Sequence, residues 1–437
     1  MAEKIILEEK LDQINATLEE QLGRSNTSYA GIGEEVRNIN SHLSTQNGIL
    51  AQMYTTMLPD TVSWQDIKLA VRNGIAPLIY PVGTQIVTKW VDKANNNKEY
   101  QMPYDIVHYG RVTLESGEII DKAMFLESHY TLPHDLQFSH ERAFLRCPDG
   151  LAAGTYYFTY VGSNWGNNVK KNTVVCFKLT QDLPAGGRIA GCYGAPDQTM
   201  DKWRIYSYSD AKTLLETVTP EFEAAEGAVN LGDMQYATRS GNLNSMQEMA
   251  YGWNRYSTSA LRQYLNSSAD KGTWWAEADG WDIRPDQLDT KPGFLSGVEE
   301  EFLDIIAPTM VRTAVNTVQD KADIGAEYED TYDKFFIASI EQEYINPQIA
   351  GVEGEYWEYW RRRLGLTKPQ GWYAENLNPR HIRYALNAQS SPQYVVLRSA
   401  SRGYACSPWC VYSTGYVRTN SARNGYRSCP ACIITGR

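Results

Sequence analysis

Four cysteines near the C-terminal end of the sequence have the type and spacing of possible metal ligands. Three residues separate Cys406 from Cys410, and two separate Cys429 from Cys432. Two close thiol pairs are how zinc knuckles hold a tetrahedral ion, although the first pair is wider than usual. Cys429 and Cys432 alone also have the spacing of a redox pair, but the flanking pattern is not a strand followed by a helix. We favour burial of these two cysteines in a final core strand, and a zinc site stays open.

The segment 401–427 has a composition suited to ligand binding. Tyr, Ser, Gly, Asn and Arg dominate it, as they dominate antibody paratopes, where Tyr supplies contact area and Arg supplies bidentate hydrogen bonds. No Asp or Glu follows Glu375, so this end of an acidic chain is locally basic. Carboxylate, phosphate or sulfate groups would suit it. The alternative is an ordinary turn-rich β segment, because turn residues overlap this composition.

Other catalytic chemistry finds little support. The six histidines have no metal-ligand spacing, and neither a phosphate-binding loop nor a G-x-S-x-G elbow occurs. We expect the carboxylates at 299–301 and 353–358 to lie on solvated helix faces rather than to form catalytic pairs. The arginines at 361–363 are best explained as a basic helix end that complements the helix dipole. The sequence therefore predicts no enzyme and no cofactor.

Bulk properties narrow the class of protein. A chain of 437 residues predicts two to four domains, and a net charge of -11 argues against a general nucleic-acid binder. No apolar run is long enough to span a bilayer, and the N-terminus opens without a signal-peptide pattern. We therefore expect synthesis in a cytoplasm and no membrane insertion. Seven cysteines, an odd number, do not indicate a disulfide framework.

The first 58 residues carry a narrow apolar stripe. The stripe repeats at steps of four and three through Leu7, Leu11, Ile14 and Leu18. After an interruption it resumes with Ile32. A stripe this thin suits helix pairing rather than globular packing. Because poor helix formers surround it, this helix should need partner chains, and we expect a homotrimer. A single helix lying on its own domain is the alternative for the first segment.

The sequence predicts an α+β multidomain protein. The expected parts are an N-terminal coiled-coil stalk (1–58), a β-rich trunk domain (59–146), a β-sandwich-like module (147–215), a connector (216–244) and a C-terminal ligand-binding domain (245–437). A capping box at Ser63–Asp66 predicts a short helix that ends near Asn73. Alternation at 84–90 predicts a strand, as do the patterns at 154–161 and 173–179. Helices are expected at 257–266 and 297–307.

The C-terminal part resembles a known family through an ordered set of weak motifs. They comprise Trp253, Ser257, Ser259, Leu261, Arg262, Leu265 and Asn266, then Trp274-Trp275 and Phe294-Leu295, then Thr331 to Ser339, Glu341, Tyr344, Glu353 to Tyr356, and finally Val396 to Ala400. This order resembles C-type-lectin-like domains of phage and bacterial proteins, including the variable proteins of diversity-generating retroelements. The segment from Trp64 to Val82 also resembles the trunk of such phage proteins. The Ser428-Cys429 insertion departs from the closing motif of such domains.

The resemblance implies a diversified binding face. Such retroelements randomise adenines in Asn codons, and the set of residues reached in this way includes Tyr, Ser, Cys, Gly, Thr, Arg and Asn but excludes Lys, Glu, Gln, Met and Trp. The compatible positions, our candidate ligand-binding residues, are Ser401, Gly403, Tyr404, Cys406, Ser407, Cys410, Tyr412, Ser413, Thr414, Tyr416, Arg418, Thr419, Asn420, Ser421, Arg423, Asn424 and Tyr426. Trp409 falls outside this set and is expected to be fixed scaffold. Val395, Leu397, Val411, Val417 and Ile433 are expected to hold the face from below.

These observations together predict a receptor-binding protein of a phage tail fibre or baseplate, located in the virion and made in the host cytoplasm. Its N-terminal region would contact other tail proteins, and its C-terminal domain would bind a host-surface protein or glycan. The calcium-binding triplets of sugar-binding C-type lectins are absent, so no calcium dependence is expected. A structural virion subunit without a receptor role is the alternative, followed by an enzyme of the formylglycine-generating type, which shares the lectin-like fold.

Overall fold

The computed structural model describes residues 13–21, 41, 63–140, 143–147, 149–159, 174–179, 182, 185, 187–190, 203–206, 214–218, 229–230, 235–236, 254–278, 282–315, 328–402 and 407–437. Helices and several separate sheets are mixed in this part of the chain, which confirms the α+β class. Residues 13–21 are helical, and Ile14 and Leu18 of the apolar stripe are each 57% exposed. Within the described ranges, no helix has the length and apolar character needed to cross a membrane.

We call the described residues of 63–140 and 254–437 the body. It begins with two short helices. Helix α2 (Trp64–Arg72) starts at the predicted capping box, in which the Ser63 hydroxyl accepts from the Asp66 N–H and the Asp66 carboxylate accepts from the Ser63 N–H. It ends at Asn73, as predicted. Pro77 lies in the first turn of the next helix, α3 (Ala76–Ile79), where a proline is favourable.

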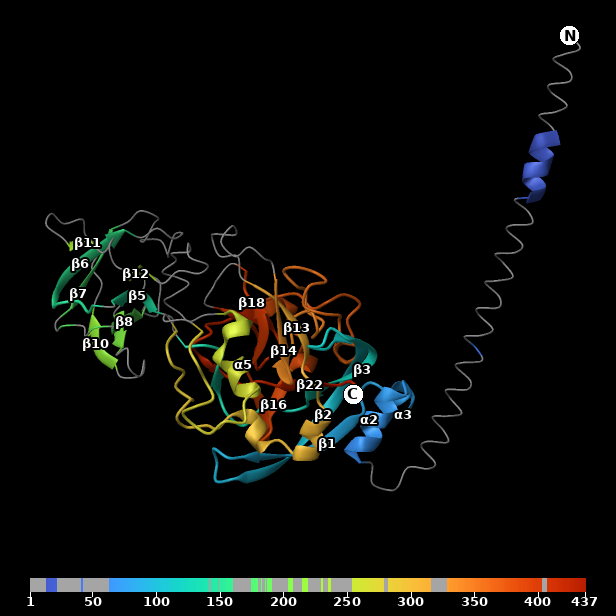
Figure 1. Cartoon of the computed structure of the whole chain (residues 1–437), viewed down its shortest axis with the longest axis horizontal. Helices are drawn as coiled ribbons and strands as arrows, with labels where there is room; N and C mark the ends of the chain where they lie inside the picture. Colours follow the sequence, from blue (N-terminus) through green and yellow to red (C-terminus); the bar gives the residue numbers. More distant parts are fainter. Residues whose placement is uncertain are drawn as a thin grey trace, which may run out of the picture.

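The central sheet joins both ends of the body. Its order is β1 (Gln85–Asp92), β2 (Lys98–Thr113), β3 (Ile119–Ser128), β22 (Pro430–Ile434) and β15 (Phe335–Ile337). All neighbours pair antiparallel, and Figure 1 shows β3 and β22 side by side. The chain after β22 also lies against α2 (Figure 1), since a Cβ on Gly436 would meet the Arg72 backbone at 2.6 Å. The segment 63–140 and the C-terminal segment therefore share one sheet, whereas the sequence placed them in different domains.

Smaller elements surround this sheet. The helices are α5 (Ala260–Leu265), α6 (Glu300–Asp304) and α8 (Glu358–Leu364), with 3-10 turns η2 (Tyr256–Thr258), η3 (Phe294–Gly297), η4 (Ala374–Asn376) and η5 (Pro379–His381). The pairs are β13 (Thr309–Ala314) with β14 (Tyr328–Asp333), β16 (Arg383–Ala385) with β17 (Ala388–Gln393), and β4 (Leu136–Gln137) with β21 (Gly425–Tyr426). A three-stranded sheet contains β18 (Val395–Ala400), β19 (Pro408–Val411) and β20 (Val417–Thr419).

The remaining strands form two sheets of their own. One has the order β10 (Leu214–Val218), β9 (Trp203–Tyr206), β8 (Gly187–Ala190), β5 (Ala143–Cys147) and β12 (Gln235–Tyr236), and the other β11 (Val229–Asn230), β6 (Gly154–Thr159) and β7 (Val174–Leu179). No strand pairing of the described residues joins them to the body. Strands β11 and β12 lie in the expected connector (216–244). These two sheets therefore include residues beyond 215, where the sequence placed the end of the β-sandwich-like module. Residues 160, 161 and 173, at the ends of the strand patterns expected at 154–161 and 173–179, lie outside the described residues.

Aromatic side chains fill the core of the body. Trp64 of α2 packs on Phe302 of α6 with ring centroids 4.5 Å apart, and Trp90 of β1 packs on Phe294 at 5.8 Å. Full burial of such a side chain contributes about 1.5–3 kcal/mol. These contacts link the segment before residue 140 with the segment after 254 through packing as well as through backbone pairing.

Candidate functional site

The segment 401–427 lies mainly on the sheet β18-β19-β20. All six residues of β18 and all four of β19 are buried, so this sheet is anchored in the core. Residues 412–416 connect β19 to β20 in a tight loop, in which the Tyr412 N–H donates to the Tyr416 carbonyl at 2.8 Å. Gly415 has φ +89°, and a Cβ there would collide with the Asn378 carbonyl. This loop therefore requires glycine at 415.

Three tyrosines gather on this sheet. The centroid of the Tyr412 ring lies 4.4 Å from that of the stacked Tyr416 ring and 4.6 Å from that of the edge-on Tyr394 ring. The Asn420 side-chain amide donates to the Tyr412 hydroxyl at 3.0 Å, and Arg418 is exposed on the adjacent strand β20. We call Tyr394, Tyr412, Tyr416, Arg418 and Asn420 the tyrosine face.

The central phenol of this face remains neutral over the physiological pH range. Burial, with smaller contributions from Cys410 and Tyr416, raises the pKa of Tyr412 to about 12. The nearby Arg418 charge acts in the opposite direction but does not outweigh burial. The face consequently offers flat apolar rings, one cation and neutral hydrogen-bonding groups, a combination typical of protein interfaces.

Most of the predicted variable positions are accessible. Among the described residues, those partly or fully exposed are Ser407, Tyr412, Ser413, Thr414, Tyr416, Arg418, Thr419, Asn420, Arg423 and Asn424. Gly403, Tyr404 and Cys406 lie outside the described residues. By contrast, Trp409, which lies outside the compatible set, is buried, and so are Val411, Val417 and Ala422, which are not among the candidate positions.

Four predicted positions lie beneath the surface. Ser401, Cys410, Ser421 and Tyr426 are buried, and the Tyr426 hydroxyl accepts from the Asn424 side chain at 3.0 Å. Their side chains support the sheet, so the accessible face is narrower than the sequence predicted. The expected scaffold residues Val395, Leu397, Val411, Val417 and Ile433 are all buried, which confirms that part of the prediction.

Three of the four cysteines in the C-terminal pattern are buried thiols. Cys410, Cys429 and Cys432 are free and buried, and burial raises the pKa of each thiol. Protonated buried thiols are poor nucleophiles and poor metal ligands. Within the ranges that the structure describes, no group of three or more His, Cys, Asp or Glu side chains is arranged to hold a metal ion. Cys406, the remaining member of the four-cysteine pattern, is outside these ranges.

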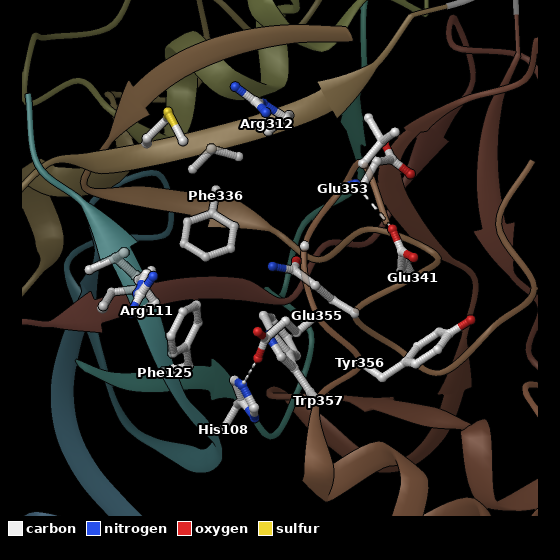
Figure 2. A pocket seen from close by; sticks show the side chains of 18 of the residues that line it. His108, Arg111, Phe125, Arg312, Phe336, Glu341, Glu353, Glu355, Tyr356 and Trp357 are labelled. Atoms are coloured by element: carbon white, nitrogen blue, oxygen red, sulfur yellow. Dashed lines mark hydrogen bonds and ion pairs between the residues drawn. The ribbon is translucent and has the colours of Figure 1, made fainter. Parts of the chain in front are cut away.

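A cavity of about 710 Å³ lies elsewhere in the body, at residues that the sequence did not single out together. Strands β2 and β3 contribute His108, Arg111 and Phe125 to its lining, and β13 contributes Arg312. The segment 351–357 closes another side (Figure 2). Two register shifts in β2, at Ile106/His108 and at Gly110/Val112, flank His108. Such bulges redirect side chains next to functional sites.

A buried polar network holds the segment that carries Glu353. Glu341 accepts from the backbone N–H groups of Gly351 and Glu353, at 2.6 and 3.1 Å. Glu353 in turn accepts from the Ser399 hydroxyl at 2.5 Å and from the Ala314 N–H at 3.1 Å. Burial raises the pKa of Glu353. Only 2% of Glu353 is exposed, so the expected solvated position for this carboxylate is wrong.

Arg398 completes this network from β18. Its guanidinium donates to the carbonyls of Ile337 and Glu353 and to the Gln342 side-chain oxygen, at distances of 2.5–3.0 Å. The partners come from segments far apart in the sequence. Burial lowers the pKa of Arg398, although Glu353 acts in the opposite direction. A side chain that satisfies this many buried acceptors has a structural role.

Other residues that carry the family resemblance also maintain the fold. Arg262 donates to the buried Asp333 carboxylate at 2.7 Å, and the Asn266 side chain bonds the backbone of Lys334 and Phe335 at 2.7–3.1 Å. The arginines at 361–363 form the last turn of α8, as predicted. The motifs therefore mark structural positions, and neither the tyrosine face nor the cavity depends on them alone.

Comparison with known proteins gives one match. Residues 231–436 match the family described as Domain of unknown function (DUF6273). No curated protein and no solved structure matches the chain. The matched segment leaves out strands β1, β2 and β3, which supply the rest of the central sheet. The C-terminal segment of this chain is thus similar to a family of unknown function, the DUF6273 domains.

Proposed function

We propose that this chain is a receptor-binding protein of a phage tail, which recognises a host-surface ligand through the tyrosine face. The observation that carries the proposal is the division of the segment 401–427. Most of the described candidate positions are partly or fully exposed, whereas the apolar residues Trp409, Val411, Val417 and Ala422 between them are buried. A face that tolerates substitution needs such a fixed core beneath it.

The chemistry of the face supports protein or glycan recognition. Stacked tyrosines present contact area at a low entropic cost, because few bonds must be fixed on binding. Arg418 adds a planar donor that can pair with carboxylate, sulfate or phosphate groups. Binding energy in such interfaces concentrates in Tyr, Trp and Arg side chains. We assign this role to Tyr416 and Arg418, while Tyr412 also packs against the core.

We also propose a C-type-lectin-like fold for the body and a trimeric stalk for the N-terminus. Antiparallel pairing between β3 and the last strand β22, which brings the ends of the body together, is compatible with such a fold. The exposed Ile14 and Leu18 are compatible with helix pairing between chains. Three copies of a weak face would gain affinity through avidity.

Binding of the labelled full chain to a panel of bacterial strains tests the proposed function. Tyr416→Ala and Arg418→Ala should each weaken binding to a recognised strain by at least about tenfold, because hot-spot truncation costs about 2 kcal/mol or more. Tyr332→Ala and Arg361→Ala are matched controls, since both residues are exposed but lie on β14 and α8. Equal binding by all four variants would contradict the proposal and favour a structural virion subunit.

A further inference from the structure

The cavity in Figure 2 has the size and lining of a small-molecule site. Its volume of about 710 Å³ is within the range of about 300–1,000 Å³ typical of such sites. Phe125 and Trp357 contribute aromatic rings whose centroids are 6.2 Å apart, and Figure 2 shows the rings of Phe125 and Phe336 between Arg111 and Glu355. The partly exposed Met310 also lines the cavity. Because Phe336 and Trp357 are each only 1% exposed, the apolar surface that a ligand ring can reach comes mainly from Phe125 and Met310.

The polar groups around these rings include both donors and acceptors. The Gln342 side chain is 6% exposed; its oxygen accepts from the Ser339 N–H and from Arg398, whereas its amide nitrogen has no hydrogen-bond partner among the described residues. The Glu355 carboxylate is 77% exposed, and within the part of the chain that the structure describes its hydrogen-bond partner is His108 Nε2, at 3.1 Å. The Arg111 guanidinium is 69% exposed and uses its Nε to bond Asp121. Each of these groups can accommodate a further hydrogen bond.

Gly354 keeps the Gln342 amide accessible from this side. Its φ is +114°, and a Cβ at this position would lie 3.0 Å from the Gln342 amide nitrogen. Any larger residue would therefore be strained and would crowd that nitrogen. The unpartnered donor and the glycine beside it provide space for an oxygen atom of a ligand.

Formal charges in the lining are balanced. Three arginines, Arg111, Arg312 and Arg398, are matched by three glutamates, Glu341, Glu353 and Glu355. The arginines at the surface already have partners, since Arg312 forms two hydrogen bonds of 2.7 Å with Asp330. An anionic ligand would therefore find no excess of positive charge here.

We propose that this cavity binds a neutral saccharide residue. Adjacent hydroxyl groups of a sugar both donate and accept hydrogen bonds, which matches a guanidinium, a carboxylate and an amide around one space. The apolar face of the sugar ring would lie on the Phe125 side of the cavity. This site is separate from the tyrosine face and does not depend on the proposed function of that face.

Saturation-transfer NMR on the full chain tests the proposal with D-glucose, D-galactose, D-mannose and N-acetyl-D-glucosamine as neutral ligands. We expect at least one of them to bind and to lose about tenfold or more in affinity in both Arg111→Ala and Glu355→Ala. Arg361→Ala and Glu301→Ala are the matched exposed controls and should bind as the wild type does. Because Arg111 and Glu355 are exposed, their variants should unfold at the wild-type temperature.

Three outcomes would overturn the proposal. The first is the absence of binding to all four neutral sugars. The second is stronger binding of D-glucuronic or D-galacturonic acid than of any neutral sugar, which would indicate a charge-selective site. The third is undiminished sugar binding by Arg111→Ala and Glu355→Ala, which would place the sugar elsewhere. Methyl glycosides of the same sugars distinguish two supporting cases: retained binding indicates a residue within a glycan chain, and lost binding a free sugar.

Discussion

A buried charge cluster beside helix α8 should make stability depend on pH. Arg383 contacts the Glu127 carboxylate, which also accepts from the Trp360 indole N–H at 3.0 Å. His381 Nε2 lies 2.8 Å from Glu343, and the Arg383 guanidinium lies 4.2 Å from the Trp360 ring centroid. All five side chains are buried, so solvent barely screens their interactions.

Two groups in this cluster have pKa values far from their usual ones, in opposite directions. Burial raises the pKa of Glu127 from 4.5 to about 8, with Arg383 opposing the rise and Glu343 adding to it. Burial also raises the pKa of Glu343. Burial lowers the pKa of His381 from 6.5 to about 3, and the Arg383 charge acts in the same direction. The folded protein thus prefers a protonated carboxyl and a neutral imidazole.

The direction of each effect follows from proton linkage. Because the folded Glu127 keeps its proton up to about pH 8, its stabilising contribution is complete below pH 4.5 and is lost as the pH rises toward 8. Because His381 stays neutral when folded, its contribution is complete above pH 6.5 and is lost as the pH falls toward 3. The slopes of Glu127 and His381 cancel between pH 4.5 and 6.5, whereas the raised pKa of Glu343 adds a fall in the same direction as that of Glu127. Above pH 6.5, loss of the Glu127 contribution lowers the free energy of unfolding by about 2 kcal/mol in total, and below pH 4.5 loss of the His381 contribution lowers it by about the same amount. Both losses proceed at about 1.4 kcal/mol per pH unit.

Guanidinium-chloride unfolding at a series of pH values, followed by tryptophan fluorescence, tests this prediction. The unfolding midpoint of the wild type should fall as the pH rises from 6.5 to 8, where Glu127 loses its proton and His381 no longer compensates. Glu127→Gln resembles the protonated carboxyl and should remove most of the fall above 6.5. Glu301→Gln, an exposed control, should leave it unchanged. Identical profiles for the wild type and Glu127→Gln above pH 6.5 would refute the reasoning.

Three further predictions concern the core. Cys410, Cys429 and Cys432 should resist maleimide labelling in the native protein, because burial keeps their thiols protonated. They should react after denaturation, which peptide mapping can show, and rapid labelling of the native protein would contradict their buried placement. Arg398→Met should destabilise the protein by about 3–5 kcal/mol, because several buried acceptors lose their donor, and an unchanged unfolding midpoint would argue against the network. Trp409→Ala should cost about 3–5 kcal/mol in the same assay, and a small effect would mean that Trp409 is not a core residue.

Local features of the fold could be predicted from the sequence. The capping box before α2, the strand near 84–90 and the arginines in the last turn of α8 depend on neighbouring residues, and the structure contains each of them. The scaffold under the tyrosine face was also predictable, because Val411 and Val417 are apolar residues that alternate with turn residues.

Long-range pairings could not be predicted in this way. Strand β22 pairs with β3, and Glu353 is buried because it meets Ser399 and the Ala314 N–H, which lie far away in the sequence. The cavity likewise needs residues from β2, β13 and the segment 351–357. Composition distinguished the accessible segment from the core, but it could not show that Cys410 points inward, since the buried side of a short strand is set by its partners.

The central claim is that the exposed positions of 401–427 form a diversified ligand-binding face. Deep sequencing of these codons in a natural population tests it most directly. We expect substitutions to concentrate at exposed compatible positions such as Tyr412, Tyr416 and Arg418, while Trp409 and Val411 stay fixed. A uniform segment, or substitutions spread equally over buried and exposed positions, would contradict the claim.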